Sequence, residues 1–221
     1  MIDYSKNELY CFNLVLGGRK IPGIHLNYPK ILDKKKFNRE CLEELKQKGL
    51  MDDDEKFTDE AMLKLDIVKS YKDLGNYVMI NRLAVGIGTN NKLILVGSKD
   101  NETLQFDFTN VKLLLEGLFG QYPFLGKEDM GKSNRPNILS KEQFEKRLDS
   151  VSIDDMLYFV KVENNEPIDK FVIYQLNDKI YEYSYSSLIE REYQPKEARM
   201  RIFRLFVKDL DNEIGGVANG R

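Results

Sequence analysis

The chain has 221 residues, of which 42% are hydrophobic, and its 34 basic and 36 acidic residues leave a formal net charge of −2. This length accommodates one large domain or two small ones, and the apolar share excludes an intrinsically disordered chain. The near balance of charge excludes a whole-molecule attraction to nucleic acid or anionic lipid. No apolar run is long enough to span a membrane, and the N-terminal residues lack a signal-peptide pattern, so we expect a cytoplasmic protein.

Three helices are predicted before the first long apolar strand pattern. Ser5 and Glu8 have the spacing of a capping box, in which a hydroxyl and a carboxylate accept free backbone N–H groups, ahead of an apolar helix at Leu9–Leu16. Asp33 is the expected N-cap of a second helix, and Thr58 is the expected N-cap of a third. The region up to the third helix is therefore predicted to be mostly helical.

A strand pattern then replaces the helical one. Tyr77–Ile87 is rich in aliphatic and β-branched residues, and the polar turn Gly88–Asn91 leads from it into the apolar run Leu93–Val96. A second turn precedes Thr103–Phe108, where alternation places the apolar side chains on one face. Short connections of this kind predict antiparallel pairing of the strands.

The same order of elements follows in the second half. A helix at Val111–Phe119 leads to the break Gly120–Pro123, and Ser140 with Gln143 forms another capping box. Three strands are then predicted, at Met156–Glu163, Ile168–Leu176 and Ile180–Tyr185. A last helix is expected to start near Pro195.

The two halves, residues 1–108 and 109–214, thus repeat one order of elements. They differ where the polar segment Gly126–Asn137 takes the place of the helix Asp33–Gln47. We interpret the chain as a single α+β domain with pseudo-twofold symmetry, built on a central, mostly antiparallel sheet of about six strands with flanking helices. Residues 215–221 are expected to form a flexible tail.

Residue types that carry catalysis or bind metals do not cluster in the sequence. His25 is the only histidine, and we interpret it as structural or exposed because no nucleophile or orienting carboxylate is suggested for it. Cys11 and Cys41 lack metal-ligand spacing and are interpreted as buried thiols, while their proximity, and with it a disulfide, stays open. Gly126–Ser133 matches the P-loop pattern, but flanking prolines and two acids within it argue against a phosphate site. We therefore predict no cofactor, no metal and no enzymatic activity.

Several short motifs occur in one order along almost the whole chain. They are Ile2–Ser5, Leu9–Leu16, Gly17, Ile21-Pro22, the segment Leu-Lys-Gln-Lys-Gly-Leu-Met-Asp at Leu45–Asp52, the helix Phe57–Tyr71 and the strands from Tyr77 to Phe108. In these motifs the chain resembles the EspG family, chaperones of type VII (ESX) secretion. It departs from that family in having no Trp, in its composition, and in a short hairpin loop. Its richness in Lys and Asn suggests a relative from the Firmicutes.

The resemblance implies an EspG-like fold, in which helical bundles flank the sheet, and a cytosolic chaperone function. Such a protein would cover the exposed apolar tip of a secreted helical-hairpin protein of the WXG or LXG type. In the family, the sheet, one hairpin loop and the C-terminal helices form the partner surface. Carried onto this sequence, the expected partner-binding residues are Gly88, Thr89, Asn90, Asn91, Lys92, Arg199, Arg201 and Arg204. The oligomeric state stays open.

Two other classes of function are compatible with the same residues. An immunity protein or other interaction module for a secreted toxin would have the same composition, and neighbouring genes would distinguish it. The stretch Leu42–Leu50 with Phe57–Ala61 also resembles the helix-to-wing segment of winged-helix regulators. However, four consecutive acids at Asp52–Glu55 stand where a DNA-binding face needs cations, so we expect no nucleic-acid partner.

Overall fold

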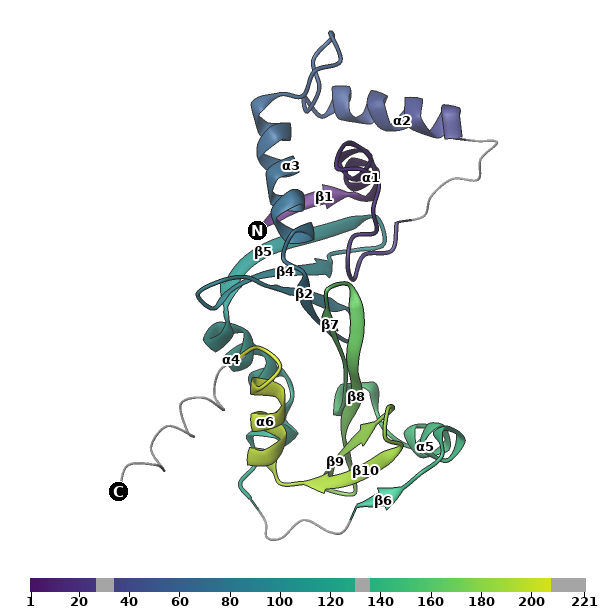
Figure 1. Cartoon of the computed structure of the whole chain (residues 1–221), viewed down its shortest axis with the longest axis vertical. Helices are drawn as coiled ribbons and strands as arrows, with labels where there is room; N and C mark the ends of the chain where they lie inside the picture. The colour runs from purple at the N-terminus through teal and green to yellow at the C-terminus, as the bar shows by residue number, and fades with distance from the viewer. Residues whose placement is uncertain (27–33, 130–135, 208–221) are drawn as a thin grey trace.

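The computed structural model describes residues 1–26, 34–129 and 136–207 of the chain (Figure 1). Within these ranges the helices are α1 (Lys6–Val15), α2 (Lys34–Gln47), α3 (Asp59–Lys72), α4 (Val111–Gln121), α5 (Lys141–Leu148) and α6 (Pro195–Phe203), with 3-10 turns η2 (Pro123–Gly126) and η3 (Ile153–Asp155). The strands are β1 (Ile2–Ser5), β2 (Asn76–Ile80), β3 (Leu83–Ile87), β4 (Lys92–Ser98), β5 (Thr103–Asn110), β6 (Asn137–Ile138), β7 (Met156–Glu163), β8 (Glu166–Leu176), β9 (Lys179–Ser184) and β10 (Ile189–Tyr193). The expected N-cap Asp33, residues 130–133 of the P-loop-like pattern and the expected tail at 215–221 lie outside the described residues.

The strands form one sheet of ten, in the order β1-β5-β4-β3-β2-β7-β8-β9-β10-β6. Every neighbouring pair is antiparallel, and β2 meets β7 at the centre, where Met79 lies opposite Val160. The predicted α+β class and antiparallel sheet are confirmed. The predicted number of about six strands is wrong.

The additional strands have two causes. Tyr77–Ile87 forms two strands because Asn81 adopts a left-handed backbone, with a φ of 50°, and closes a tight turn between β2 and β3. The Asn81 amide holds this turn by donating to the Tyr122 hydroxyl at 2.9 Å and to the Met156 carbonyl at 3.2 Å. The other three, β1, β6 and β10, have two to five residues, too few for a strong local pattern, so pairing with a strand already in the sheet defines them.

Side-chain caps fix where several helices begin. Ser5 and Glu8 form a reciprocal capping box at α1, and Ser140 and Gln143 form one at α5. The Thr58 hydroxyl accepts a backbone N–H in the first turn of α3. These three predicted starts are confirmed, because each depends on residues only three positions apart.

The helices cover the two faces of the sheet unequally. One face packs against α4, η2 and α6 and buries a continuous core that includes Phe159 and Phe171. On the opposite face, α1 and α3 cover the first five strands around Phe106, with α2 packed on α1. Over the last strands, the described residues place only α5 on that face, and Phe144 of α5 stacks on Tyr183 with ring centroids 3.8 Å apart. Figure 1 shows α1, α2 and α3 at the top and α5 at the lower right, with β7 and β8 running between them.

Glu44 on α2 is expected to make the stability of the protein fall at acid pH. Burial raises the pKa of this carboxyl, but hydrogen bonds from Lys48, Ser5 and Asn7 outweigh burial and hold the pKa below its ordinary value of 4.5. Because the folded-state pKa is depressed, the stabilisation is present above pH 4.5 and is lost as the pH falls through the folded-state value. The stability difference between wild type and Glu44→Gln, measured by urea denaturation, should therefore shrink on acidification. A constant difference would contradict this role.

Candidate partner-binding surface

On the less covered face of the sheet, a strip of partly accessible side chains lies around the central pair β2 and β7. This open strip consists of Met79, Tyr158, Val160, Val162, Lys170 and Tyr185, of which Lys170 is exposed and the others are partly buried. Backbone pairing brings them together, because Met79 lies opposite Val160 on β7, and Val160 lies opposite Lys170 on β8. Alternation along β7 places its three members on this one face.

Aromatic rings and one cation form the end of the open strip nearest α5. The Lys170 ammonium lies 4.5 Å from the Tyr185 ring centroid and 5.4 Å from that of Tyr158. Burial is the main cause that raises the pKa of Tyr185 to about 12, so its hydroxyl is protonated at neutral pH. Both rings keep part of their surface in contact with solvent. This end of the strip can therefore contact a partner by apolar packing and by hydrogen bonding.

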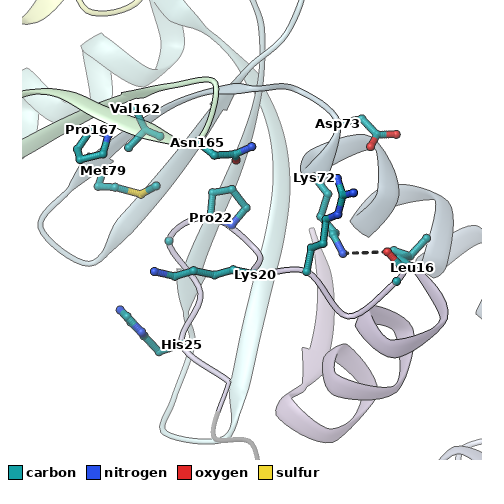
Figure 2. A pocket seen from close by; sticks show the side chains of 13 residues that line it. Leu16, Lys20, Pro22, His25, Lys72, Asp73, Met79, Val162, Asn165 and Pro167 are labelled. Atoms are coloured by element: carbon teal, nitrogen blue, oxygen red, sulfur yellow. Dashed lines mark hydrogen bonds between the residues drawn. The ribbon is translucent and has the colours of Figure 1, made fainter.

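A cavity of about 850 Å³ opens at the other end of the strip (Figure 2). It is lined by Leu16, Gly17, Arg19, Lys20, Pro22, Gly23, His25, Lys72, Asp73, Met79, Val162, Asn165 and Pro167. These residues come from the segment after α1, the end of α3, strands β2, β7 and β8, and the turn between β7 and β8. We call it the basic cavity, because its lining carries three basic side chains, Arg19, Lys20 and Lys72, and a single carboxylate.

The segment after α1 is fixed against the sheet by specific contacts. Ile21 and Ile24 are buried in the core, and the Tyr71 hydroxyl donates to the Pro22 carbonyl at 2.9 Å. Gly23 has a φ of 73°, and a Cβ there would lie 2.7 Å from the Met79 sulfur. Only glycine fits this conformation and this close approach. These contacts within the protein therefore fix the position of this wall of the basic cavity.

Lys72 joins the two helix ends that meet at the basic cavity. Its ammonium donates to the Asn13 side-chain oxygen at 2.6 Å and to the Leu16 carbonyl at 3.3 Å, the second of which is drawn in Figure 2. Burial lowers the pKa of Lys72. Arg19 and Lys20 are exposed on the segment, as is His25. Lys72 thus serves the fold, while Arg19 and Lys20 present positive charge to solvent.

The expected partner hairpin Gly88–Lys92 forms the turn between β3 and β4. Asn90 and Asn91 adopt left-handed backbone conformations, and the Gly88 N–H donates to the Lys92 carbonyl at 2.9 Å. Thr89 and the three residues after it are exposed. A Cβ at Gly88 would lie 3.6 Å from Leu74, which follows α3. The hairpin therefore lies at the end of α3, and its part in partner binding stays a prediction.

The three arginines expected on the last helix have different surroundings. Arg199 donates to the Leu125 carbonyl, and Arg201 pairs with Asp169 at 2.7 Å and with Glu182 at 2.9 Å. Arg204 is exposed at the C-cap of α6. Since α6 covers the face of the sheet opposite to the open strip, the structure does not bring these arginines together with the strip.

The two cysteine side chains, Cys11 and Cys41, have the surroundings of structural thiols. Cys11 and Cys41 are both buried free thiols that hydrogen-bond to each other, and burial raises the pKa of each. The sequence left their proximity open, and the structure thus establishes it.

In the described ranges, no group of three or more His, Cys, Asp or Glu side chains could hold a metal ion. No described helix combines the length and apolar character needed to cross a membrane.

The open strip was not predicted from the sequence, and His25 was the only residue of the basic cavity weighed there as a functional candidate. One signal pointed to the strip. The sequence predicts a polar segment, Gly126–Asn137, in place of a helix in the second half, and fewer helices there would leave more of the sheet exposed. The basic cavity has no local signal, because its lining is drawn from segments about 150 residues apart, from Leu16 to Pro167.

A family model described as "Domain of unknown function (DUF5081)" matches residues 3–187. This range contains every residue of the open strip and of the basic cavity, and it ends before α6. No curated protein matches the chain.

Proposed function

We propose that this chain, which belongs to the DUF5081 family, is a cytoplasmic chaperone or adaptor of type VII secretion that holds a helical-hairpin client before export. The observation that carries the proposal is the open strip. It is an apolar and aromatic surface that α1 and α3 border at one end and α5 at the other. Apolar side chains that keep part of their surface accessible in one contiguous strip offer a site for a partner.

The order of the strands supports an EspG-like, duplicated architecture. Each half contains an edge strand, β1 or β6, and four later strands that run from the centre of the sheet outwards, and the last of these four pairs with that edge strand. Under the proposal, halves 1–108 and 109–214 are related by a pseudo-twofold axis between β2 and β7. The described helices differ between the halves, since α1, α2 and α3 lie between β1 and β2, whereas α4 precedes β6 and α5 lies between β6 and β7.

The chemistry of the open strip suits the apolar tip of a helical hairpin. Tyr158 and Tyr185 offer broad rings with few rotatable bonds, and Val160 and Val162 continue the apolar surface towards the basic cavity. An amphipathic helix would lay its apolar side chains on these residues, and Lys170 would lie at the polar margin. The client thereby hides surface that would otherwise cause aggregation.

The family resemblance adds two further contact regions to the proposal. The exposed hairpin Gly88–Lys92 corresponds to the family's partner loop, and Arg204 is the exposed arginine at the end of α6. Arg199 and Arg201 make contacts within the protein, so they would support α6 rather than touch the client.

Co-expression with a small helical-hairpin protein encoded next to this chain is expected to yield a soluble 1:1 complex on gel filtration. Replacing both Tyr158 and Tyr185 with alanine should break up this complex, because the two rings form much of the apolar contact. Lys35→Glu, an exposed change on α2, should leave it intact. Separate elution of the wild-type chain and every such client would contradict the proposal.

Arg204→Glu in the same assay tests the role of α6. It should weaken the complex more than Lys35→Glu does, and equal effects would remove α6 from the partner surface. A complex formed only with the catalytic domain of a toxin, with loss of its activity, would instead favour the immunity function.

A further inference from the structure

The charge of the basic cavity differs from that of the chain as a whole. The protein is close to neutral, with a formal net charge of −2, yet the cavity lining holds Arg19, Lys20 and Lys72 against Asp73 alone. The Lys72 ammonium donates two hydrogen bonds within the protein, to Asn13 and to Leu16. The positive charge available to a ligand therefore comes mainly from Arg19 and Lys20.

The basic and apolar parts of the lining lie on different walls. The segment after α1 supplies Arg19, Lys20 and His25 together with Pro22, and α3 supplies Lys72, whereas strands β2, β7 and β8 supply Met79, Val162 and Pro167. We call these three residues the cavity floor. Figure 2 shows Lys20 and His25 extending from the segment towards the side on which the floor residues lie. A ligand of this cavity meets positive charge on one side and apolar surface on the other.

We infer that the basic cavity binds an extended acidic stretch of the client, whose carboxylates pair with Arg19 and Lys20 while its apolar side chains rest on the cavity floor. The inference rests on the proposed function and names a second contact for the same client. In an extended chain, successive side chains point to opposite sides. Alternating acidic and apolar residues would therefore satisfy both walls at once.

The surroundings do not resemble a phosphate site. Phosphate sites use helix N-termini or converging backbone N–H groups. Here α1 and α3 both reach the cavity with their C-terminal ends, at Leu16 and at Lys72 with Asp73, so neither helix offers N-terminal N–H groups and an anionic ligand depends on the side chains of Arg19 and Lys20. The cavity also continues into the open strip through Met79 and Val162, so one client can occupy both.

The test uses the full chain and two fluorescein-labelled peptides, one of alternating Leu and Asp and one of alternating Leu and Asn. Fluorescence anisotropy should show binding of the acidic peptide at least about tenfold tighter than that of the neutral peptide, with affinity that falls as salt is added. The double variant Arg19→Glu/Lys20→Glu should lose about tenfold in affinity for the acidic peptide. The matched control Lys34→Glu/Lys35→Glu, with the same charge change on exposed positions of α2, should bind like the wild type.

Three outcomes would overturn the inference. They are equal affinity for the two peptides, equal losses in the two double variants, and displacement of the acidic peptide by inorganic phosphate at matching concentration. Because the probe contains no client, failure here leaves the co-expression result standing. Conversely, a client complex that forms normally with Arg19→Glu/Lys20→Glu removes the cavity from the client's contacts and leaves the chaperone proposal intact. Circular dichroism verifies that both double variants are folded.

Discussion

Replacing Glu190 with alanine is expected to lower the free energy of unfolding by about 3 kcal/mol. Glu190 on β10 has 1% of its surface exposed, and it accepts hydrogen bonds from Arg147 on α5 and from the buried Tyr174 hydroxyl on β8. The hydrogen bond from Arg147 to Glu190 is the main cause that raises the pKa of that guanidinium. Without the carboxylate, a buried hydroxyl and a guanidinium lose their partner. The expected loss is at the lower end for a buried pair because about a third of the Arg147 side chain stays exposed.

Urea denaturation and thermal melting measure this loss, and each kcal/mol corresponds to about 2–4 °C in a protein of this size. Glu190→Gln keeps the shape and one acceptor oxygen, so it should lose less than the alanine variant. Glu145→Ala serves as the control, because Glu145 forms an exposed pair with Lys141 on α5, and such pairs contribute about 0.3–0.5 kcal/mol. Similar losses for Glu190→Ala and Glu145→Ala would show that the buried network does not hold α5 to the sheet.

Reversing the charge of Arg201 is expected to destabilise the whole protein, by about 3–5 kcal/mol. Arg201 pairs with Asp169 on β8 and Glu182 on β9, and its guanidinium lies 4.0 Å from the centre of the Phe171 ring. Glu182 is buried, with 7% of its surface exposed. Arg201→Glu would therefore place three carboxylates together in a poorly hydrated site and leave α6 without its main polar contact to the sheet.

Arg204→Glu is the matched control for this prediction, since it makes the same charge change three residues later on an exposed side chain. Its melting temperature should stay close to that of the wild type, because exposed charges contribute little to stability. Equal melting temperatures for Arg201→Glu and Arg204→Glu would contradict the structural role of Arg201. The comparison also shows why a client-binding assay with Arg201→Glu alone would confuse lost folding with lost contact.

The parts of the fold that depend on neighbouring residues could be predicted from the sequence. Ser5 with Glu8 and Ser140 with Gln143 specify helix starts within one turn. The turn between β8 and β9 is formed by Asn177-Asp178 with φ values of 50° and 61°, as the type of these residues indicates. Strands β6 and β10 escaped detection because pairing with other strands, not local pattern, defines them. For β1, only the family resemblance pointed to Ile2–Ser5.

The candidate site required contacts that no local pattern reports. Tyr158 and Val160 were recognised as strand residues, but a strand with apolar residues on both faces gives no sign of which face stays open. Arg201 was expected at the partner surface because the family resemblance places that surface on the C-terminal helices. Its partners Asp169 and Glu182 precede it by 32 and 19 residues and come from two other strands. The partial burial of this arginine therefore depends on contacts between distant residues, which a local sequence pattern does not report.

The two outermost strands limit how far the sheet can grow. β6 has two residues and β1 has four, and Asp3 on β1 forms an ion pair with Lys99 at 2.5 Å. Edges this short offer few unpaired backbone donors and acceptors, and charge beside them opposes the docking of a further strand. Under the proposed function, the chain would hold clients with exposed apolar surface. Protected edges would then let it bind such a client without joining it in an aggregate through paired sheet edges.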